Sequence, residues 1–409
     1  MTSRIRFRVF GCFAAASLMV AACSSPSSET TSSTRSTTTR PGHTSTTSGR
    51  SSTSTTAPRT TTTTIAPPST TLAPGTTGAY KVPPAAPAST PLPPPAALAP
   101  FATTTSGEGV WHPVGRRVGT KAAMYTTTLQ EPGAPGVVAG IAWMDPKLLS
   151  AQLYSGSSSP GGGPWALTAP IEPAAAQTLV AAFNGGFKFP ASGGGYYEYG
   201  HTVFPLVNGV GSFVIYKNGT ATVADWGRDV QMGSNIAAVR QNLTLLVDHG
   251  QPASGLNPGD TSLWGSTLGG IPNVWRSGVG VTSNGALVYV AGPSLNIVQL
   301  AQLLVRAGAV RAMELDINVY WPTFSTYSPV PSSALASPFN GTDLLANMTG
   351  QPDRFFTSWW ARDFVTMSAR PTRSRKGAGP PTSSSSTATS TRWTARDLGR
   401  TPSPCVPVV

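Results

Sequence analysis

Short apolar segments separated by turn residues dominate the middle of the chain. In two places a pair of such segments flanks an Asn-Gly dipeptide, which is the strongest short signal for a β-hairpin. We predict hairpins at both places, and a third pair of strands joined at Asp145-Pro146-Lys147. The strand pairs are 212–216 with 220–223, 279–282 with 286–290, and 136–143 with 148–154.

Two segments have the features of helices. Residues 172–183, with Pro173 at a first-turn position, predict a helix that stops at Asn184-Gly185-Gly186. A second helix is predicted to begin with Ser294 as its N-cap, because apolar residues follow with helical periodicity, and to end at Gly308.

The order of these elements indicates the fold class. A strand is predicted over residues 309–317, directly after the second helix. Hairpins, helix and strand in this order suggest helices packed on a mixed sheet. We therefore predict an α/β (α+β) fold, with a single mixed β-sheet domain and packed helices over residues 107–371, flanked by disordered N- and C-terminal segments.

The first 23 residues have the pattern of an export signal. Arg4, Arg6 and Arg8 precede an uncharged apolar stretch that is shorter than the ~20 residues of a permanent membrane span. The small residues before Cys23 resemble the lipobox of bacterial lipoproteins, which implies lipidation of Cys23. The predicted location is therefore the extracytoplasmic face of the cell membrane, held by a lipid anchor. The alternative is an ordinary secretory signal that is cleaved near Ala22.

Two segments have compositions that cannot bury a core. Residues 24–106 are rich in Ser and Thr and then in Pro, and residues 372–409 are rich in Arg, Ser, Thr and Pro. Such compositions are typical of disorder. We predict a disordered linker before the domain and a disordered basic tail after it. A shifted reading frame would also produce the composition of the tail.

The charge distribution narrows the classes of partner. The chain carries 28 basic and 16 acidic residues, but residues 107–371 hold 14 of each, so the net charge of +12 lies in the ends. A nucleic-acid groove needs its positive charge on the folded part, so we predict no nucleic-acid partner. The three cysteines are Cys12, Cys23 and Cys405, and the histidines of the domain lack ligand spacing. We therefore predict no metal and no cofactor.

The predicted strand over residues 309–317 carries the first candidate site. Glu314, Asp316 and Asn318 alternate with apolar residues, so their side chains share one face. Two carboxylates this close raise the proton affinity of one of them, which suits acid–base catalysis. A solvated face at the edge of a sheet is the alternative.

Two further segments suit an anion. In Asn184-Gly185-Gly186 the glycines let backbone N–H groups approach a ligand closely, although a helix stop has the same pattern. Arg276-Ser277 leads into a hairpin, and a guanidinium binds phosphate through two parallel hydrogen bonds. A lone arginine is more often a surface residue.

Taken together, these segments resemble the phosphodiester glycosidases, the relatives of the lysosomal N-acetylglucosamine-1-phosphodiester α-N-acetylglucosaminidase. The resemblance runs from residue 174 to residue 363 and rests on four segments in the order of the family. They are Ala182–Phe187, Arg276–Val281, the helix with Leu300-Ala301 and Ala307–Ala309, and Ala312–Asp316.

The resemblance implies a mixed α/β fold and cleavage of the bond between a sugar C1 and a phosphate oxygen. A phosphate monoester leaves readily as an anion, so one carboxylate and a few phosphate-binding groups suffice. The family follows its Leu-Asp with a run of glycines, where this chain has Ile317-Asn318-Val319-Tyr320-Trp321. The predicted roles are Asp316 as base or nucleophile, Glu314 as its partner, and Asn184, Gly185, Gly186, Arg276, Ser277 and Asn318 on the substrate or phosphate side.

The functional prediction is a cell-envelope hydrolase that cleaves a glycosyl-1-phosphodiester in a surface or wall glycan. Its partners are the glycan or glycosyl-phosphate substrate and, through the lipid anchor, the membrane. The alternative is a non-catalytic wall-binding or assembly lipoprotein that retains the fold.

Overall fold

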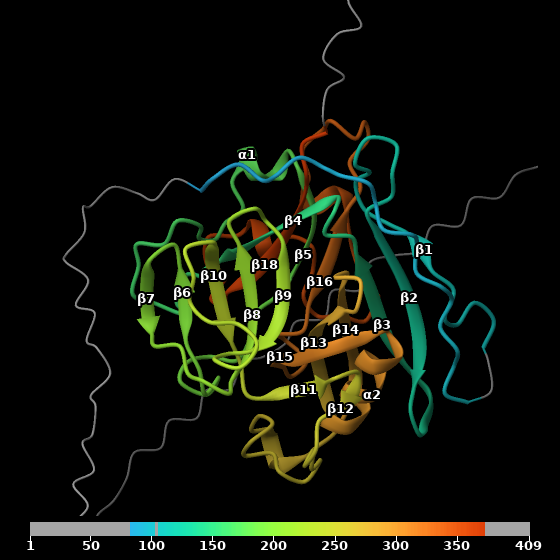
Figure 1. Cartoon of the computed structure of the whole chain (residues 1–409). Helices are drawn as coiled ribbons and strands as arrows, with labels where there is room; N and C mark the ends of the chain where they lie inside the picture. The colour runs from blue at the N-terminus through green and yellow to red at the C-terminus, as the bar shows by residue number, and fades with distance from the viewer. Residues whose placement is uncertain (1–81, 103–104, 373–409) are drawn as a thin grey trace, which may run out of the picture. The chain divides into compact units, whose positions relative to one another are not determined.

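The computed structural model describes residues 82–102 and 105–372, and β-strands dominate this part of the chain (Figure 1). The strands are β1 (His112–Pro113), β2 (Met124–Glu131), β3 (Ala134–Met144), β4 (Leu149–Tyr154), β5 (Leu179–Asn184), β6 (Tyr196–Glu198), β7 (His201–Phe204), β8 (Gly211–Tyr216), β9 (Ala221–Asp225), β10 (Ile236–Gln241), β11 (Leu245–Asp248), β12 (Gln251–Pro252), β13 (Val274–Thr282), β14 (Leu287–Leu295), β15 (Ala309–Ile317), β16 (Phe324–Tyr327), β17 (Gly341–Asp343) and β18 (Phe364–Ala369). They form an eight-stranded sheet in the order β1-β2-β3-β14-β13-β15-β11-β12. Two five-stranded sheets have the orders β7-β6-β10-β8-β9 and β17-β16-β5-β18-β4.

The predicted α/β class with one mixed sheet is wrong, because the protein is mostly β. All pairings between these strands are antiparallel. The described residues contain two α-helices, α1 (Pro173–Ala176) and α2 (Ile297–Arg306). Three short 3₁₀ helices complete the regular structure: η1 (Leu268–Gly270), η2 (Pro338–Asn340) and η3 (Arg354–Phe356).

The main source of this error is the segment before Asn184. It was expected to be helical to residue 183, yet α1 is one turn long and the residues that follow form β5. Every residue of β5 is buried, and β5 lies between β16 and β18 in its sheet. A short uninterrupted apolar segment fits a buried strand and a buried helix equally well by periodicity, and here the sheet contacts select the strand.

The other predicted elements form, with changes in their pairing. Both Asn-Gly hairpins are present, as β8 with β9 and β13 with β14. Strands β3 and β4 also form, but β3 pairs with β2 and β14 whereas β4 pairs with β18 in another sheet. The predicted helix after residue 294 is α2, but the predicted N-cap Ser294 is wrong, because Ser294 belongs to β14. The N-cap is Asn296, whose side chain accepts hydrogen bonds from the N–H groups of Val298 and Gln299.

The three sheets meet around Phe183 of β5. Its ring lies 6.3 Å from that of Phe213 on β8, 5.4 Å from that of Tyr289 on β14 and 5.7 Å from that of Phe324 on β16 (centroid to centroid). Helix α2 packs on β13, β14 and β15 of the large sheet, in a second apolar cluster (Figure 1). The first apolar cluster is the one around Phe183. Residues of β15 pack in both clusters, which fixes this strand, and β15 carries Asp316.

Residues 82–102, which we name the N-terminal strap, belong to the segment that was predicted to be a disordered linker. The structure instead places them against the domain, where Leu92, Leu98 and Phe101 pack on the apolar cluster of α2. The Leu92 N–H donates to a carboxylate oxygen of Asp145 over 2.9 Å, and the Leu98 N–H donates to the carbonyl of Gly109 over 2.9 Å.

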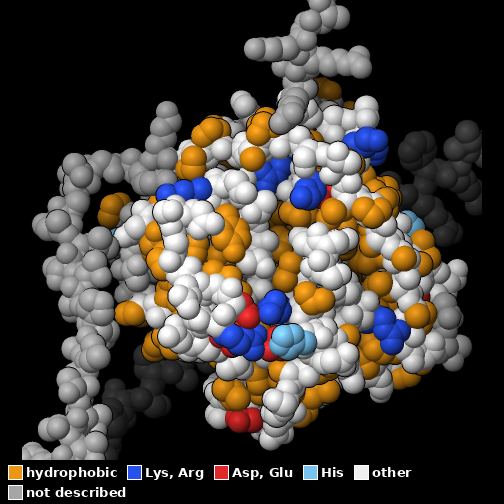
Figure 2. Space-filling model, viewed as in Figure 1, with side chains coloured by type: hydrophobic (Ala, Val, Ile, Leu, Met, Phe, Trp, Pro, Cys, Tyr) orange, Lys and Arg blue, Asp and Glu red, His pale blue; other side chains and the backbone are white. Residues whose placement is uncertain are grey.

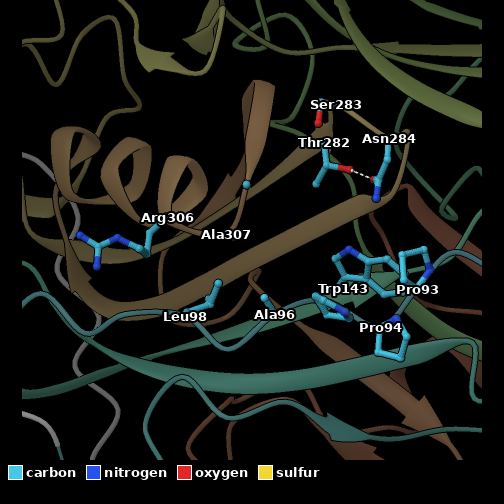
Figure 3. Close-up of a pocket in the computed structure, with 12 residues that line it drawn as sticks. Pro93, Pro94, Ala96, Leu98, Trp143, Thr282, Ser283, Asn284, Arg306 and Ala307 are labelled. Atoms are coloured by element: carbon cyan, nitrogen blue, oxygen red, sulfur yellow. Dashed lines mark hydrogen bonds between the residues drawn. The ribbon is translucent and has the colours of Figure 1, made fainter.

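A cavity of about 370 Å³ lies between the strap and the end of α2. Figure 3 shows Pro93, Pro94, Ala96 and Leu98 of the strap across from Trp143, the Thr282–Asn284 turn and Arg306. The strap therefore forms part of the surface of the domain.

The predicted signal with Cys23, most of the predicted linker and residues 373–409 of the predicted tail lie outside the described residues. Within the described part, no helix has both the length and the hydropathy for a membrane span.

On the face seen in Figure 2, basic and acidic side chains lie next to one another. Partly exposed ion pairs join Arg228 to Asp229 and Asp248, and Arg311 to Asp229.

Candidate active site

A cavity of about 240 Å³ opens where β15 ends. Strand β15 lies between β13 and β11 in the large sheet, so its last residues are fixed on both sides. The cavity is lined by segments that are far apart in the sequence. They are Phe187, Lys188 and Ala191 after β5, Ser262, Leu263, Gly265 and Ser266 in the loop before β13, Asp316, Ile317 and Asn318 at the end of β15, and Arg362 before β18.

Asp316 is the one carboxylate among the residues that line this cavity. Its side chain is 6% exposed. Oδ1 accepts a hydrogen bond from the Ile317 N–H over 3.0 Å, whereas Oδ2 is buried and has no hydrogen-bond partner among the described residues. Burial raises the pKa of Asp316 to about 7, although the positive charge of Arg362 opposes the rise. An acid with such a pKa can exchange a proton near neutral pH.

Two cations accompany this carboxylate. Nη2 of Arg362 lies 3.5 Å from Asp316 Oδ2, and the Arg362 guanidinium rests 4.3 Å from the ring centroid of Trp321. Its Nη1 is buried without a hydrogen-bond partner in the described part of the chain. Lys188 is exposed and also lines the cavity. One carboxylate and two cations give the cavity a net positive charge, which suits an anionic ligand.

The backbone of Asp316 is braced by two of the predicted site residues. The Asp316 N–H donates to the carbonyl of Gly185 over 2.9 Å, and the Ser277 hydroxyl donates to the carbonyl of Asp316 over 2.7 Å. The Asn184 amide in turn donates to Ser277 Oγ over 3.0 Å. Asn184 and Ser277 are buried and outside the cavity lining. The structure thus places them behind Asp316, where they position it.

The two glycines allow close packing next to the site. A Cβ on Gly185 would lie 2.0 Å from Oδ2 of Asp363, and one on Gly186 would lie 2.9 Å from Oδ1 of Asn242. The Gly185 N–H donates to the Asp363 carbonyl, and the Phe187 N–H donates to Asn242. The N–H groups of Gly185 and Phe187 are therefore engaged within the protein, and the close contacts give both glycines a packing role; the anion nest stays a prediction.

Glu314 and Arg276 form a buried ion pair, with 2.5 Å between Oε1 and Nη1. Arg276 also donates to the carbonyls of Leu295, Trp264 and Pro272. Its guanidinium is therefore engaged on every nitrogen and is outside the cavity lining. Burial raises the pKa of Glu314, and Arg276 opposes that rise.

This ion pair corrects the interpretation of two predicted residues. Glu314 is fully buried, so it does not share an open polar face with Asp316, and the alternative of a solvated edge also fails. Through the carbonyls of Trp264 and Pro272, Arg276 holds the loop that carries Ser262, Gly265 and Ser266. The predicted contact of Arg276 with a phosphate does not fit this geometry.

Asn318 reaches the cavity through an unusual backbone conformation. Its φ is +74°, and its N–H donates to the Trp275 carbonyl over 2.9 Å. The Trp321 N–H donates to the Asn318 carbonyl over 3.2 Å, so Asn318 begins a turn that returns Trp321 toward Arg362. Asn318 lines the cavity, and its contact with a substrate stays a prediction.

Sequence analysis did not find the two cations. Arg362 directly precedes Asp363 in the sequence, but the ion-pair partner of Asp363 is Arg240. Lys188 directly follows the Gly-Gly-Phe segment, and that adjacency was the available signal. Ser262 and Ser266 lie in a loop that showed no pattern. Within the described ranges no cluster of three His, Cys, Asp or Glu side chains forms a metal site.

The chain is similar to known proteins in both structure and sequence. The catalytic domain of zebrafish N-acetylglucosamine-1-phosphodiester α-N-acetylglucosaminidase, auto-inhibited by its pro-peptide, is similar over 64% of this chain and 88% of that chain, with 16% identity and a TM-score of 0.37. A hypothetical protein from Synechocystis is similar over 61% of this chain and 62% of that chain, with 12% identity and a TM-score of 0.32. Among curated proteins, none matches the chain. The phosphodiester glycosidase family model matches residues 177–316, a range that begins before Asn184 and ends at Asp316. Residues 177–316 therefore match the phosphodiester glycosidase family, the family that the sequence motifs resemble.

Proposed function

We propose that this domain hydrolyses a glycosyl-1-phosphodiester, with Asp316 as the catalytic carboxylate. The observation that carries the proposal is the buried Oδ2 of Asp316, which has no hydrogen-bond partner among the residues that the structure describes and belongs to a cavity lined by Arg362 and Lys188. A buried polar atom without a partner is costly. A substrate or water that bonds to Oδ2 offsets this cost.

The chemistry needs one ionised carboxylate at the sugar C1. In the proposed step a water molecule attacks C1 and gives its proton to Asp316 Oδ2. The bond between C1 and the phosphate oxygen breaks, and its electron pair leaves with the phosphate. The phosphate monoester is a stable anion, so the leaving group needs less protonation than a sugar alcohol does. Attack by water inverts the anomeric centre. Attack by Asp316 itself, followed by hydrolysis, retains it.

The phosphate side of the site is assigned to Arg362 and Lys188. Nη1 of Arg362, which has no hydrogen-bond partner within the described part of the chain, can donate to a phosphate oxygen, and charge-assisted hydrogen bonds of this kind are about twice as strong as neutral ones. Arg276, the predicted phosphate ligand, is replaced in this role because its donors are engaged elsewhere. The cations also stabilise the negative charge that gathers on the leaving phosphate.

The experiment is turnover of methyl N-acetylglucosaminyl 1-phosphate and a panel of other hexose phosphodiesters, with Asp316→Asn as the comparison. We expect loss of kcat by ~10²-fold or more in the variant.

Because burial raises the pKa of Asp316 to about 7, activity should rise with pH through this value. The variant should melt at the same temperature as the wild type or higher at pH 8, since it no longer buries a charge. Failure of the folded wild type to turn over any of the panel would instead support the non-catalytic, wall-binding alternative.

The cellular location is part of the same proposal. A lipid on Cys23 would keep the hydrolase at the outer face of the cell membrane, where surface and wall glycans are found. Cys23→Ser should then release the protein from the membrane fraction. A variant that stays in that fraction after a salt wash contradicts the lipid anchor and leaves the chemistry of Asp316 untouched.

A further inference from the structure

Arg362 is the cation nearest to the proposed catalytic carboxylate, and hydrogen bonds hold it weakly. Its Nη1 has no partner among the described residues, and its Nη2 is 3.5 Å from Asp316 Oδ2. That separation exceeds the usual range of a hydrogen bond between nitrogen and oxygen, about 2.7–3.2 Å. An arginine side chain has several rotatable bonds and loses substantial entropy when it is fixed. Another contact must therefore contribute to the position of this guanidinium.

The indole of Trp321 supplies that contact. The centre of the guanidinium lies 4.3 Å from the ring centroid of Trp321, within the ~6 Å range of a cation–π interaction. The interaction is directional, because the negative face of the ring attracts the cation. A guanidinium on this face leaves its edge nitrogens free to point elsewhere.

Trp321 is itself fixed by the surrounding protein. Its backbone N–H donates to the carbonyl of Asn318, which closes the turn after β15. Its ring lies 5.6 Å from that of Trp360, which is only 4% exposed. The guanidinium of Arg354 lies 4.3 Å from the centroid of the Trp360 ring. These contacts hold the indole of Trp321 in place, so that it offers a fixed aromatic face to the guanidinium of Arg362.

We propose that Trp321 is a positioning residue that holds Arg362 beside Asp316, so that Nη1 of Arg362 meets the phosphate of the substrate. The proposal rests on the proposed function and adds a residue that does not line the cavity. Trp321 acts only through Arg362. Its removal should therefore reproduce, in part, the loss of Arg362.

The electrostatic consequence concerns Asp316. Arg362 and Arg240 attract its negative charge, and Asp363 and Glu314 repel it. Arg240 is fixed by two hydrogen bonds to Asp363, and Glu314 is fixed by Arg276. Of these four charged side chains, Arg362 is the one whose position depends on its contact with Trp321. When Arg362 moves away, the pKa of Asp316 rises, and the acidic limb of the pH–rate profile moves to higher pH.

The test compares Trp321→Ala, Trp321→Leu and Trp321→Phe in the full chain, with methyl N-acetylglucosaminyl 1-phosphate as substrate. We expect Trp321→Ala and Trp321→Leu to raise KM roughly 2- to 30-fold, which is the range of a cation–π contact, and to shift the acidic limb of kcat/KM upward. Trp321→Phe keeps an aromatic face and should restore much of both. Trp359→Ala is the matched control, since its indole is 70% exposed and contacts Trp360 at the end of the same row.

A double-mutant cycle separates positioning from a structural role. In an Arg362→Ala background, Trp321→Ala should have almost no further effect on KM or on the pH profile. An undiminished effect in that background overturns the proposal. So does a Trp321→Leu variant that behaves like Trp321→Phe, because a merely structural ring would be replaced by any apolar side chain of adequate size.

A measurement without turnover keeps this proposal separate from the proposed function. The pKa of Asp316 can be followed by the carbon-13 chemical shift of its carboxyl group in the full chain, with melting curves as a check of folding. We expect a higher pKa in Trp321→Ala than in the wild type and in Trp359→Ala. An unchanged pKa overturns the positioning role even where the wild type is active. A raised pKa in a protein without activity supports the positioning role and contradicts only the hydrolysis.

Discussion

Arg240 and Asp363 form a two-fold hydrogen-bonded ion pair beneath the candidate active site. Nε of Arg240 lies 2.7 Å from Oδ2 of Asp363, and Nη2 lies 3.1 Å from Oδ1. Both side chains are at most 1% exposed. Arg240 also donates to the Phe187 carbonyl, and its guanidinium lies 4.2 Å from the ring centroid of Phe189. The pair therefore holds the segment after β5 against the segment before β18, and each segment contributes a cation to the cavity.

Gly185→Ala should break this arrangement. The new Cβ would stand 2.0 Å from Asp363 Oδ2, so the carboxylate must move away from Arg240. Disrupting a buried ion pair from one side costs about 3–5 kcal/mol, and we expect a loss of unfolding free energy on that scale. Chemical denaturation measures it. Gly259→Ala is the control, because its Cβ meets its nearest neighbour only at 3.4 Å.

An activity assay on the same variant adds a second check. The carbonyl of Gly185 accepts a hydrogen bond from the Asp316 N–H, so a shift of Gly185 also displaces the proposed catalytic carboxylate. We expect kcat to fall together with stability. A Gly185→Ala variant as stable as the Gly259→Ala control would show that the segment relaxes without disturbing Asp363.

Removal of the cavity cations should weaken substrate binding to different degrees. Arg362 is 14% exposed and beside Asp316, whereas Lys188 is exposed to solvent, which screens its charge. A hydrogen bond to a charged group is worth about 1.5–3 kcal/mol, so Arg362→Gln should raise KM roughly 10- to 100-fold. Lys188→Gln should raise KM less, and its effect should shrink as salt is added. Lys217→Gln, at an exposed turn outside this cavity, is the control; equal effects of all three variants contradict the assignment.

The parts of the site that follow from local pattern could be predicted, and the parts that follow from sheet register could not. Asp316 stands out because it ends an alternating strand, and Gly185 because two adjacent glycines mark a close approach. Arg276 and Glu314 were both singled out, but their mutual pairing depends on the register of β13 against β15. Arg276 was therefore assigned to the phosphate and Glu314 to Asp316 as its partner, although Arg276 and Glu314 form an ion pair with each other.

The fold class failed for a similar reason. The apolar residues of β5 carry no periodicity that separates helix from strand, so the decision depends on partners that lie far away in sequence. Strand β5 is selected by β18, some 180 residues later. Arg362 precedes β18, and its approach to Asp316 depends on the same long-range pairing. No local pattern around Arg362 encodes that approach.

Glu198→Gln should stabilise the domain at alkaline pH and have little effect at acidic pH. Burial raises the pKa of Glu198 to about 8, against the hydrogen bond from the Leu167 N–H. A carboxyl with a pKa higher in the folded than in the unfolded state binds more protons when folded. Its contribution to stability is complete below the unfolded pKa of about 4.3 and is lost as pH rises through 8.

The variant keeps an oxygen that can accept from Leu167 and cannot ionise. Its melting temperature relative to the wild type should therefore increase from pH 4.5 to pH 9. Glu172→Gln, at an exposed carboxylate, is the control for the substitution itself. A Glu198→Gln variant with a constant difference across this pH range would mean that Glu198 ionises as readily in the folded protein as in the unfolded chain.

The N-terminal strap gives the last prediction, which concerns the boundary of the folded domain. Leu92, Leu98 and Phe101 pack against the apolar cluster of α2, and the guanidinium of Arg306 lies 4.1 Å from the centroid of the Phe101 ring. A fragment that begins at residue 107, the predicted boundary, loses these contacts and exposes the cluster. At ~25 cal/mol per Å² of apolar surface, three partly buried side chains contribute on the order of 3 kcal/mol. A fragment of residues 82–372 should therefore melt roughly 5–10 °C above one of residues 107–372. Equal melting temperatures for these two fragments would place the domain boundary at residue 107 and would mean that the strap does not stabilise the domain.

Leu98→Ala in the full chain tests the same contacts without truncation and should also lower the melting temperature. Val330→Ala, at a side chain that is 94% exposed, is the control and should leave the melting temperature unchanged.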